Sequence, residues 1–299
     1  MAYRAILIES PAAVSVRNSQ LIIRTDGEHS VALEDISALL LENRQSTVTT
    51  AALSQLGQHG CAVFTCDEKH MPCAVLTPFM QHSRQLTVIE SQLAATEPMK
   101  KRLWQSVVRA KIENQAKCLS LAGKADAAAK LRAMSERVRS GDPDNVEATA
   151  AQQYFPALFG DGFTRSEDNG VNAALNYGYA ILRGCTARSL AVYGFLPAMG
   201  IHHRSGLNAF NLADDLMEPF RPVVDLFVCR SVDFDDVLTP ALKRSLFNCI
   251  NYDVLSGGQH HSVSYTIERT VQSLSRSFSE KEAALCLPEL LETAQHRYE

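Results

Sequence analysis

Residues 200–225, which read GIHHRSGLNAFNLADDLMEPFRPVVD, carry side chains that suit a divalent cation. The apolar residues that follow His203 recur at helical spacing, and Asp215 and Glu218 lie three positions apart among them. Their carboxylates therefore project from one face of the predicted helix. Carboxylate oxygens suit Mg²⁺ and Mn²⁺, and Mn²⁺ accepts an imidazole more readily than Mg²⁺ does. Two or three protein ligands with open positions indicate a catalytic ion that acts on a phosphoryl group.

The same three residues also have a simpler interpretation. Asp215 and Glu218 would then form a solvated helix face, and His203 would be an ordinary loop histidine. Against this, Pro219 and Pro222 lie inside the periodic segment, where a proline removes a helical hydrogen bond and bends the backbone. A distorted backbone beside convergent polar residues is typical of functional sites. Local sequence leaves both interpretations open.

Glu147 illustrates the same ambiguity on another segment. A helix is predicted to begin near residue 145, and Asp144 as its N-cap would place Glu147 at the third helical position. A glutamate at that position bonds back to the N–H of the cap residue in a capping box. Local sequence therefore favours a structural role for Glu147.

Length and charge narrow the class of protein. At 299 residues and 46% apolar composition, the chain is long enough for two hydrophobic cores. The start MAYRAIL lacks the features of a signal peptide and no long apolar run occurs, so we expect a cytoplasmic protein. The net charge is −4, yet residues 84–140 hold 12 Lys and Arg against 5 Asp and Glu. This basic segment fits DNA phosphates and a solvated helix face equally well.

Several common catalytic motifs do not occur in the sequence. The eight cysteines are scattered without a C-x-x-C pair, which is typical of reduced thiols and not of a zinc or disulfide framework. There is no phosphate-binding loop, dinucleotide motif, serine-hydrolase elbow or zinc-protease helix. A phosphoryl-transfer enzyme that uses a divalent ion remains possible.

The predicted elements change character near residues 71–79. Before that segment, short alternating or apolar runs predict strands, and one helix is predicted from Thr49 or Thr50 to about Gly57. After it, helical periodicity dominates, and Trp104 is expected to be a core residue. The sequence leaves the last twenty residues undecided between a helix and disorder.

We predict an α+β protein, with a small N-terminal β-domain (1–78) followed by a larger all-α catalytic domain (79–299). The expected strands are 2–8, 13–17, 21–24, 30–33, 36–41 and 61–66, and the expected later helices include 103–116, 145–155, 171–193 and 262–278.

Three segments in this order resemble the family of CRISPR-associated protein one, an adaptation endonuclease and integrase. They are GDPDNVEATAAQQYF (141–155), NAALNYGYAIL (172–182) and GIHHRSGLNAFNLADDLMEPFRP (200–222). DEKHMP (67–72) and LWQSVVRAKIENQA (103–116) are similar to the versions found in type II systems. The resemblance extends over nearly the whole chain.

This resemblance implies a metal site made from separate segments. The family's ligands fall on Glu147, His203 and Glu218, which bind Mg²⁺ or Mn²⁺ and form the catalytic centre. Asp215 matches an auxiliary acidic position, and the type II pattern favours His203 over His202. The resemblance thus reverses the local interpretation of Glu147.

The resemblance also implies substrates and partners. The β-domain would mediate a homodimer, and two homodimers would flank a dimer of CRISPR-associated protein two. The enzyme would join the 3′-hydroxyl ends of captured double-stranded DNA, the protospacer, to the CRISPR repeat by transesterification. Tyr177 matches a tyrosine that contacts DNA near the metal, although a core tyrosine fits equally well. Further candidate DNA-binding residues lie among the basic helices between Arg84 and Arg139 and beside Glu218. They are Lys101, Arg102, Arg109, Lys111 and Arg221.

Two other functions stay open. The basic segment alone predicts a DNA-binding assembly subunit whose own metal site is idle. A repair nuclease that cuts branched DNA would need the same ligands.

Overall fold

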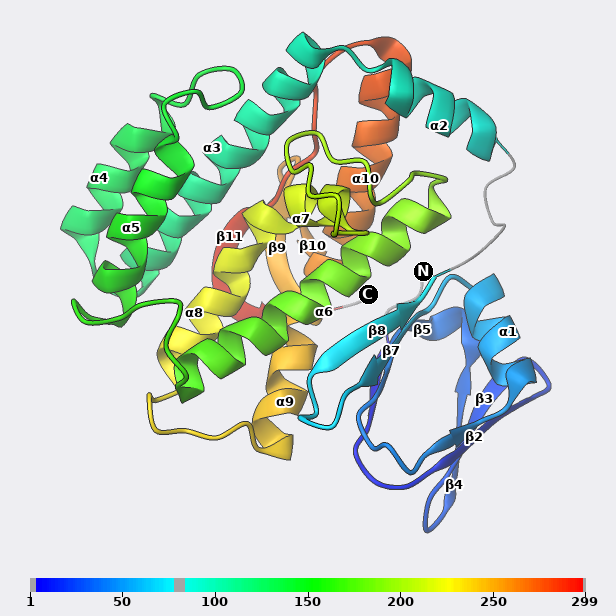
Figure 1. The fold of residues 1–299 in the computed structure, drawn as a ribbon. Helices are drawn as coiled ribbons and strands as arrows, with labels where there is room; N and C mark the ends of the chain where they lie inside the picture. Colours follow the sequence, from blue (N-terminus) through cyan, green and yellow to red (C-terminus); the bar gives the residue numbers. More distant parts are fainter. Residues whose placement is uncertain (1–3, 78–83, 298–299) are drawn as a thin grey trace.

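The computed structural model describes residues 4–77 and 84–297, and it begins with strands and continues mainly as helices (Figure 1). This arrangement confirms the predicted α+β class. The N-terminal elements are β1 (Arg4–Ile8), β2 (Ala13–Arg17), β3 (Gln20–Arg24), β4 (Glu28–Ala32), β5 (Ile36–Leu41), β6 (Thr47–Val48), α1 (Thr50–Gln58), β7 (Ala62–Cys66) and β8 (Pro72–Leu76).

These strands form two sheets in the described residues, with orders β4-β3-β2-β6 and β1-β5-β7-β8. The turn between β2 and β3 is made by Asn18 and Ser19, both with positive φ, as a tight hairpin requires. Leu21, Leu39 and Leu56 are fully buried where the two sheets and α1 meet. Alternation and turn residues thus predicted most of this region, while β8 was missed because its first residue is a proline.

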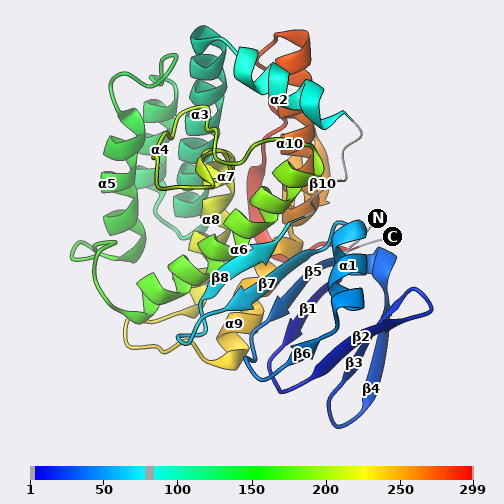
Figure 2. The same cartoon turned by 45° about the vertical axis from the view of Figure 1, so that its right-hand side comes forward.

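The later elements are mostly helices, as expected, and most of them pack against one of the two long helices α3 and α6 (Figure 2). They are α2 (Gln85–Ala94), α3 (Glu97–Leu121), α4 (Ala125–Ser135), α5 (Val146–Phe159), α6 (Gly170–Val192), α7 (Asn211–Met217), α8 (Arg221–Ser231), α9 (Pro240–Phe247), β9 (Tyr252–Ser256), β10 (Gln259–Ser262), α10 (Val263–Glu280) and β11 (Glu289–Gln295).

The all-α expectation for this part was too narrow, because β10, β9 and β11 form a further sheet within the described chain. Gly257 and Gly258 have positive φ and turn β9 back onto β10. The undecided C-terminal residues form β11, where Leu290 is buried and its N–H bonds to Asn114 of α3 at 2.9 Å. The partners of β11 are β9 and Asn114, and both lie far from it in the sequence. Periodicity within the segment therefore did not reveal the strand.

The β1-β5-β7-β8 sheet also packs against the helices. Phe64 belongs to the same apolar cluster as residues of α6, and a side chain at Gly184 would collide with its ring. The predicted boundary between residues 78 and 79 lies outside the described residues, so the division into two domains stays a prediction. Within the described ranges, no helix has the length and apolar character needed to cross a membrane.

Candidate metal and nucleic-acid site

Glu147 lies in the first turn of α5, and the loop before it fixes its position. Asn145, the N-cap, has a left-handed backbone and makes no side-chain cap bond. Asp142 supplies the cap instead, because its carboxylate accepts the N–H groups of Val146 at 2.9 Å and Glu147 at 3.0 Å. Asp144 forms an ion pair with Arg139 at 2.6 Å, so the predicted capping box was wrong. The Glu147 side chain is therefore available for other contacts.

Glu218 begins a 3₁₀ turn, Glu218–Phe220, between α7 and α8. Pro219 and Pro222 cannot donate main-chain hydrogen bonds, and the predicted distortion of the helical path occurs at this point. The path continues into α8 after the turn. The Asn114 side chain of α3 donates to the Pro219 carbonyl at 2.8 Å and so fixes the turn against α3.

Lys111 of α3 lies between the two glutamates. Its Nζ is 2.6 Å from Oε1 of Glu147 and 2.6 Å from Oε2 of Glu218. The second contact has ion-pair distance without hydrogen-bond geometry, so the buried Oε2 of Glu218 has no hydrogen-bond partner among the described residues. Arg221 approaches the other oxygen of Glu218, with Nη2 at 3.0 Å from Oε1. The two carboxylates thus converge from α5 and the 3₁₀ turn onto one ammonium group.

The pKa values of Glu218, Lys111 and Arg221 in this cluster are shifted toward their charged forms. Burial raises the pKa of Glu218, but the Lys111 and Arg221 cations outweigh burial and hold that pKa below its usual value. Burial also lowers the pKa of Lys111, but the Glu218 and Glu147 carboxylates outweigh it and the net pKa is raised.

His203 is oriented by Asp215. Its Nδ1 lies 2.7 Å from Oδ1 of Asp215, a fully buried carboxylate that also accepts the main-chain N–H groups of Ile201, His202 and His203. The hydrogen bond that His203 donates to Asp215 is the main cause of the raised pKa of His203. With Nδ1 donating to Asp215, Nε2 is the ring nitrogen left to bind a metal. Asp215 therefore orients the imidazole of His203, and its auxiliary role at the metal stays a prediction.

His202 and His203 differ in their packing on Trp104. The His202 ring stacks on the indole, with ring centroids 4.1 Å apart and planes at 3°, whereas His203 meets it edge-on at 5.7 Å. Trp104 is buried, as expected for a core residue, and it also positions both imidazoles. Sequence reasoning missed this second role because Trp104 and the histidines lie on separate segments.

By residue type, Glu147, Glu218 and His203 fit a divalent cation. The fit has direct support in the cation that both carboxylates already share. His203 lies within electrostatic reach of both glutamates. No set of three His, Cys, Asp or Glu within 4–77 and 84–297 is already arranged around a common point, however. Lys111 occupies the space between the two carboxylates.

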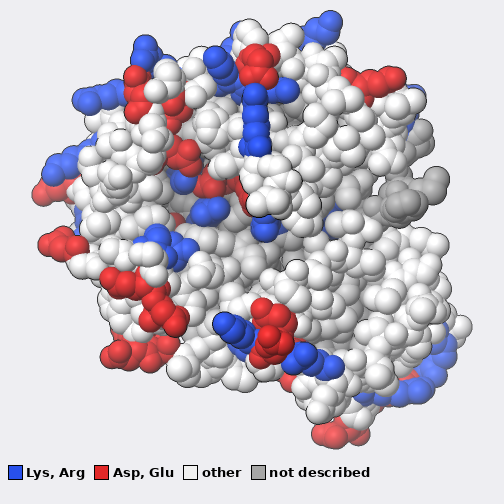
Figure 3. All heavy atoms as spheres, in the orientation of Figure 1, with Lys and Arg blue, Asp and Glu red and all other residues white. Residues whose placement is uncertain are grey.

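The predicted DNA-binding residues fall into two groups. Lys101, Arg102 and Arg109 are exposed on α3, where Arg109 also donates to the Val138 carbonyl at 3.0 Å. Figure 3 shows basic side chains along the edge of the molecule where α3 and α4 lie, and charged groups inside the central hollow. Lys111 and Arg221 instead belong to the carboxylate cluster, where Lys111 is buried, and their role in DNA binding stays a prediction.

Tyr177 does not join this site. It is fully buried, and burial raises the pKa of its hydroxyl, with Cys66 and Glu42 as the next contributors. Both neighbours belong to the N-terminal part of the chain. A ring in this position cannot stack on a DNA base, so the placement of Tyr177 fits the core interpretation.

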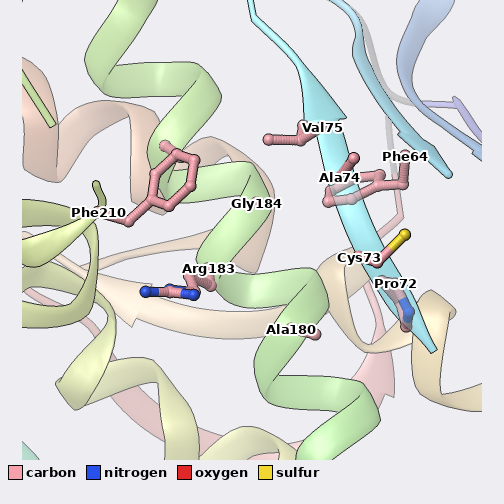
Figure 4. Close-up of a pocket in the computed structure, with 10 residues that line it drawn as sticks. Phe64, Pro72, Cys73, Ala74, Val75, Ala180, Arg183, Gly184 and Phe210 are labelled. Atoms are coloured by element: carbon pink, nitrogen blue, oxygen red, sulfur yellow. The ribbon is translucent and has the colours of Figure 1, made fainter. Parts of the chain in front are cut away.

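A separate cavity of about 100 Å³ lies between β8 and α6 (Figure 4). Its lining is mainly apolar and includes Phe64, Val75 and Phe210, with Arg183 as the charged residue. Arg183 donates to both oxygens of Asp214, at 2.7 and 2.9 Å, and so braces the start of α7. This cavity lacks the carboxylates that would support metal chemistry.

Comparison with known proteins identifies the family. The sequence profile described as "CRISPR associated protein Cas1" matches residues 6–237. The chain is also 45% identical over 304 aligned residues to the CRISPR-associated endonuclease Cas1 of Neisseria meningitidis (serogroup C, strain 8013), with 100% of both chains covered. The chain belongs to the Cas1 family. The resemblance found in the sequence is confirmed, and this Cas1 protein is a nuclease and integrase of CRISPR adaptation.

Solved structures support the fold. A casposase bound to its integration product matches this Cas1 with a TM-score of 0.74 and 20% identity, over 98% of this chain and 95% of that one. A Cas6-RT-Cas1–Cas2 complex matches with a TM-score of 0.73 and 18% identity, over 97% of this chain and 36% of that one. At these identities the likeness concerns the fold.

Proposed function

We propose that this Cas1 protein is a metal-dependent DNA integrase with Glu147, His203 and Glu218 as ligands of one Mg²⁺ or Mn²⁺. The observation that carries the proposal is the convergence of two glutamates from separate helical segments onto a shared cation, with an oriented imidazole nearby. Oxygen ligands with one imidazole suit these ions.

The proposed reaction joins the 3′-hydroxyl of captured double-stranded DNA to a phosphodiester at the edge of a CRISPR repeat. The bond from the hydroxyl oxygen to phosphorus forms as the bond to the repeat's 3′-oxygen breaks, so phosphodiesters are exchanged without hydrolysis. A bound divalent ion supplies Lewis-acid stabilisation of the phosphoryl and leaving oxygens. Asp215 holds His203 in one orientation, and Arg221 keeps Glu218 ionised.

DNA would be held chiefly by its phosphates. Lys101 and Arg102 project from the exposed side of α3, the helix that also carries Lys111. Contacts of this type give affinity without sequence information and weaken steeply with salt.

The assembly we propose is a homodimer that joins the protein called Cas2. The similar complex named above contains Cas1 together with Cas2, and the two N-terminal sheets would supply the dimer contact. The repeat and the protospacer are then substrates of the complex, which would act in the cytoplasm.

The test is strand transfer of a 3′-hydroxyl DNA into a repeat-containing plasmid, with the partner protein and Mn²⁺ present. We expect Glu147→Gln and Glu218→Gln to lose at least roughly 100-fold in rate, as the loss of a metal ligand exceeds the cost of an outer-shell change. Glu90→Gln changes an exposed carboxylate on α2 and serves as the matched control. Full integration by either site variant would refute the assignment.

A second function is favoured by one observation, the position of Lys111 between the two carboxylates. A Cas1 chain that kept this ion cluster permanently would act as a DNA-binding subunit with an idle metal site. DNA binding in chelator, with no product under Mg²⁺ or Mn²⁺, would favour that function. Product formation without a repeat would instead favour a branched-DNA repair nuclease.

A further inference from the structure

Lys111 occupies a position that the proposed ion would need. Its Nζ lies 2.6 Å from one oxygen of Glu147 and 2.6 Å from one oxygen of Glu218. Mg²⁺ binds oxygen at about 2.1 Å, so an ion that contacts both of these oxygens would overlap the ammonium. Both cations cannot lie between these carboxylates at once.

We propose that Lys111 is an internal counter-cation that holds Glu147 and Glu218 together in the metal-free protein and is exchanged for the divalent ion. This inference rests on the metal site of the proposed function. Removing the ammonium without replacement would leave the buried carboxylate of Glu218 facing that of the partly exposed Glu147, and two like charges in this position destabilise a protein. The lysine therefore stabilises the metal-free enzyme and competes with the metal.

The contacts around the cluster allow this exchange. Lys111 hydrogen-bonds to Glu147 and lies at ion-pair distance from Glu218. The carboxylate of Glu218 has a second partner, because its Oε1 faces Arg221 at 3.0 Å, while Asp142 fixes the main chain of Glu147 by accepting its N–H at 3.0 Å. Departure of the ammonium would thus leave the Glu218 carboxylate anchored, and the divalent ion would replace Lys111 as the partner of the Glu147 carboxylate.

Arg221 is itself held independently of Lys111. Its guanidinium lies over the Tyr179 ring, 4.7 Å from the centroid. Lys111 has a flexible four-carbon stem and 11% of its side chain is exposed, so it has a route out of the cluster.

The exchange would also change the local charge. Glu147, Glu218, Lys111 and Arg221 together are neutral without metal. Exchange of the ammonium for a divalent ion leaves Glu147, Glu218, Arg221 and the ion with a formal net charge of +1, which attracts a DNA phosphate. Metal loading would therefore precede tight engagement of the phosphodiester.

The test is a calorimetric Mn²⁺ titration of the full-length protein, with free Mn²⁺ followed in parallel by electron paramagnetic resonance. We expect Lys111→Met to bind Mn²⁺ at least tenfold more tightly than the wild type. Its Tm in chelator should be lower than that of the wild type, and its Mn²⁺-induced rise in Tm should be larger. Lys117→Met, an exposed lysine on the same helix, should behave as the wild type in both measurements.

Two results would overturn the inference in different ways. If the wild type binds Mn²⁺ and Lys111→Met binds it equally or more weakly, Lys111 is only a structural support. The proposed function is then unaffected. Failure of the wild type and Lys111→Met alike to bind millimolar Mn²⁺ would refute the metal site itself. If Lys111→Met does not fold, Lys111→Gln keeps a donor of similar length without charge and should show the same tighter binding.

Discussion

Two buried lysines in this Cas1 protein neutralise carboxylates, but their surroundings differ. Lys243 of α9 lies 2.9 Å from Glu42 at the end of the β5 region, and His70 approaches the same oxygen at 2.8 Å. Lys111 instead faces two glutamates, and an oxygen of one of them has no hydrogen-bond partner among the described residues. Both lysines are buried, so burial does not distinguish them.

The two lysines differ in the number of carboxylates that each contacts and in the other partners of those carboxylates. Lys243 donates a hydrogen bond to a single carboxylate, Glu42, which His70 also contacts, and this bond connects the N-terminal strands to α9. Lys111 serves two carboxylates, of which Glu218 also has Arg221 as a partner. We interpret the first cluster as a structural contact and the second as a site where one cation can replace another.

The largest expected effect is a loss of strand-transfer activity when the Lys111 cluster is changed, with activity retained when the Lys243 cluster is changed. Glu218→Gln should reduce strand transfer by at least roughly 100-fold, because a proposed ligand is lost, while the fold is retained. Circular dichroism and Tm check the fold of the same sample. Glu42→Gln, in the other cluster, should keep integration close to wild type at a temperature where it remains folded. Equal losses in the two variants would contradict the comparison.

The next effect is a lower free energy of unfolding when the Lys243 cluster is changed. Lys243→Met should lower the free energy of unfolding by about 3 kcal/mol, because Glu42 would remain buried beside His70 alone. Urea unfolding of the variant and the wild type, in chelator, measures the difference. An unchanged urea midpoint would show that the Lys243 pair contributes nothing to the contact between the strands and the helices.

A smaller effect tests the positioning of His203. Asp215→Asn should weaken Mn²⁺ binding roughly 10- to 100-fold, since the imidazole loses its oriented partner. The same substitution in a His203→Ala background should add little, because both changes act through one ligand. An undiminished effect of Asp215→Asn in that background would assign Asp215 a separate role, such as direct metal binding.

The smallest effect concerns a buried carboxyl without an ammonium partner. Burial raises the pKa of Asp225 from 3.8 to about 6, although the Tyr179 and Tyr154 hydroxyls that donate to it oppose this. The folded state therefore binds the proton more tightly, and stability should rise by about 1 kcal/mol from pH 7 to pH 5 through this group. The difference in urea stability between wild type and Asp225→Asn isolates it. A difference that does not change with pH would show that Asp225 does not titrate in this range.

The sequence predicted those features that depend on neighbouring residues. Alternation gave the bounds of β2, a continuous apolar run gave those of β5, Asn18 and Ser19 gave the hairpin turn, and two prolines gave the bend at Glu218. These features are local because strand pairing, turn geometry and helix hydrogen bonds are set within a few positions. The family motifs supplied the candidate ligands, which remain a prediction.

Only the tertiary structure decided which side chains meet. The cap of α5 comes from Asp142 and not Asp144, Tyr177 is in the core, and the end of the chain pairs as β11. Lys111 and Glu147 lie 36 positions apart, and no periodicity relates them. Their contact depends on the packing of α5 and the 3₁₀ turn against α3. The sequence grouped Lys111 with the other basic residues of its helix, whereas the structure places it between the two carboxylates of the candidate site.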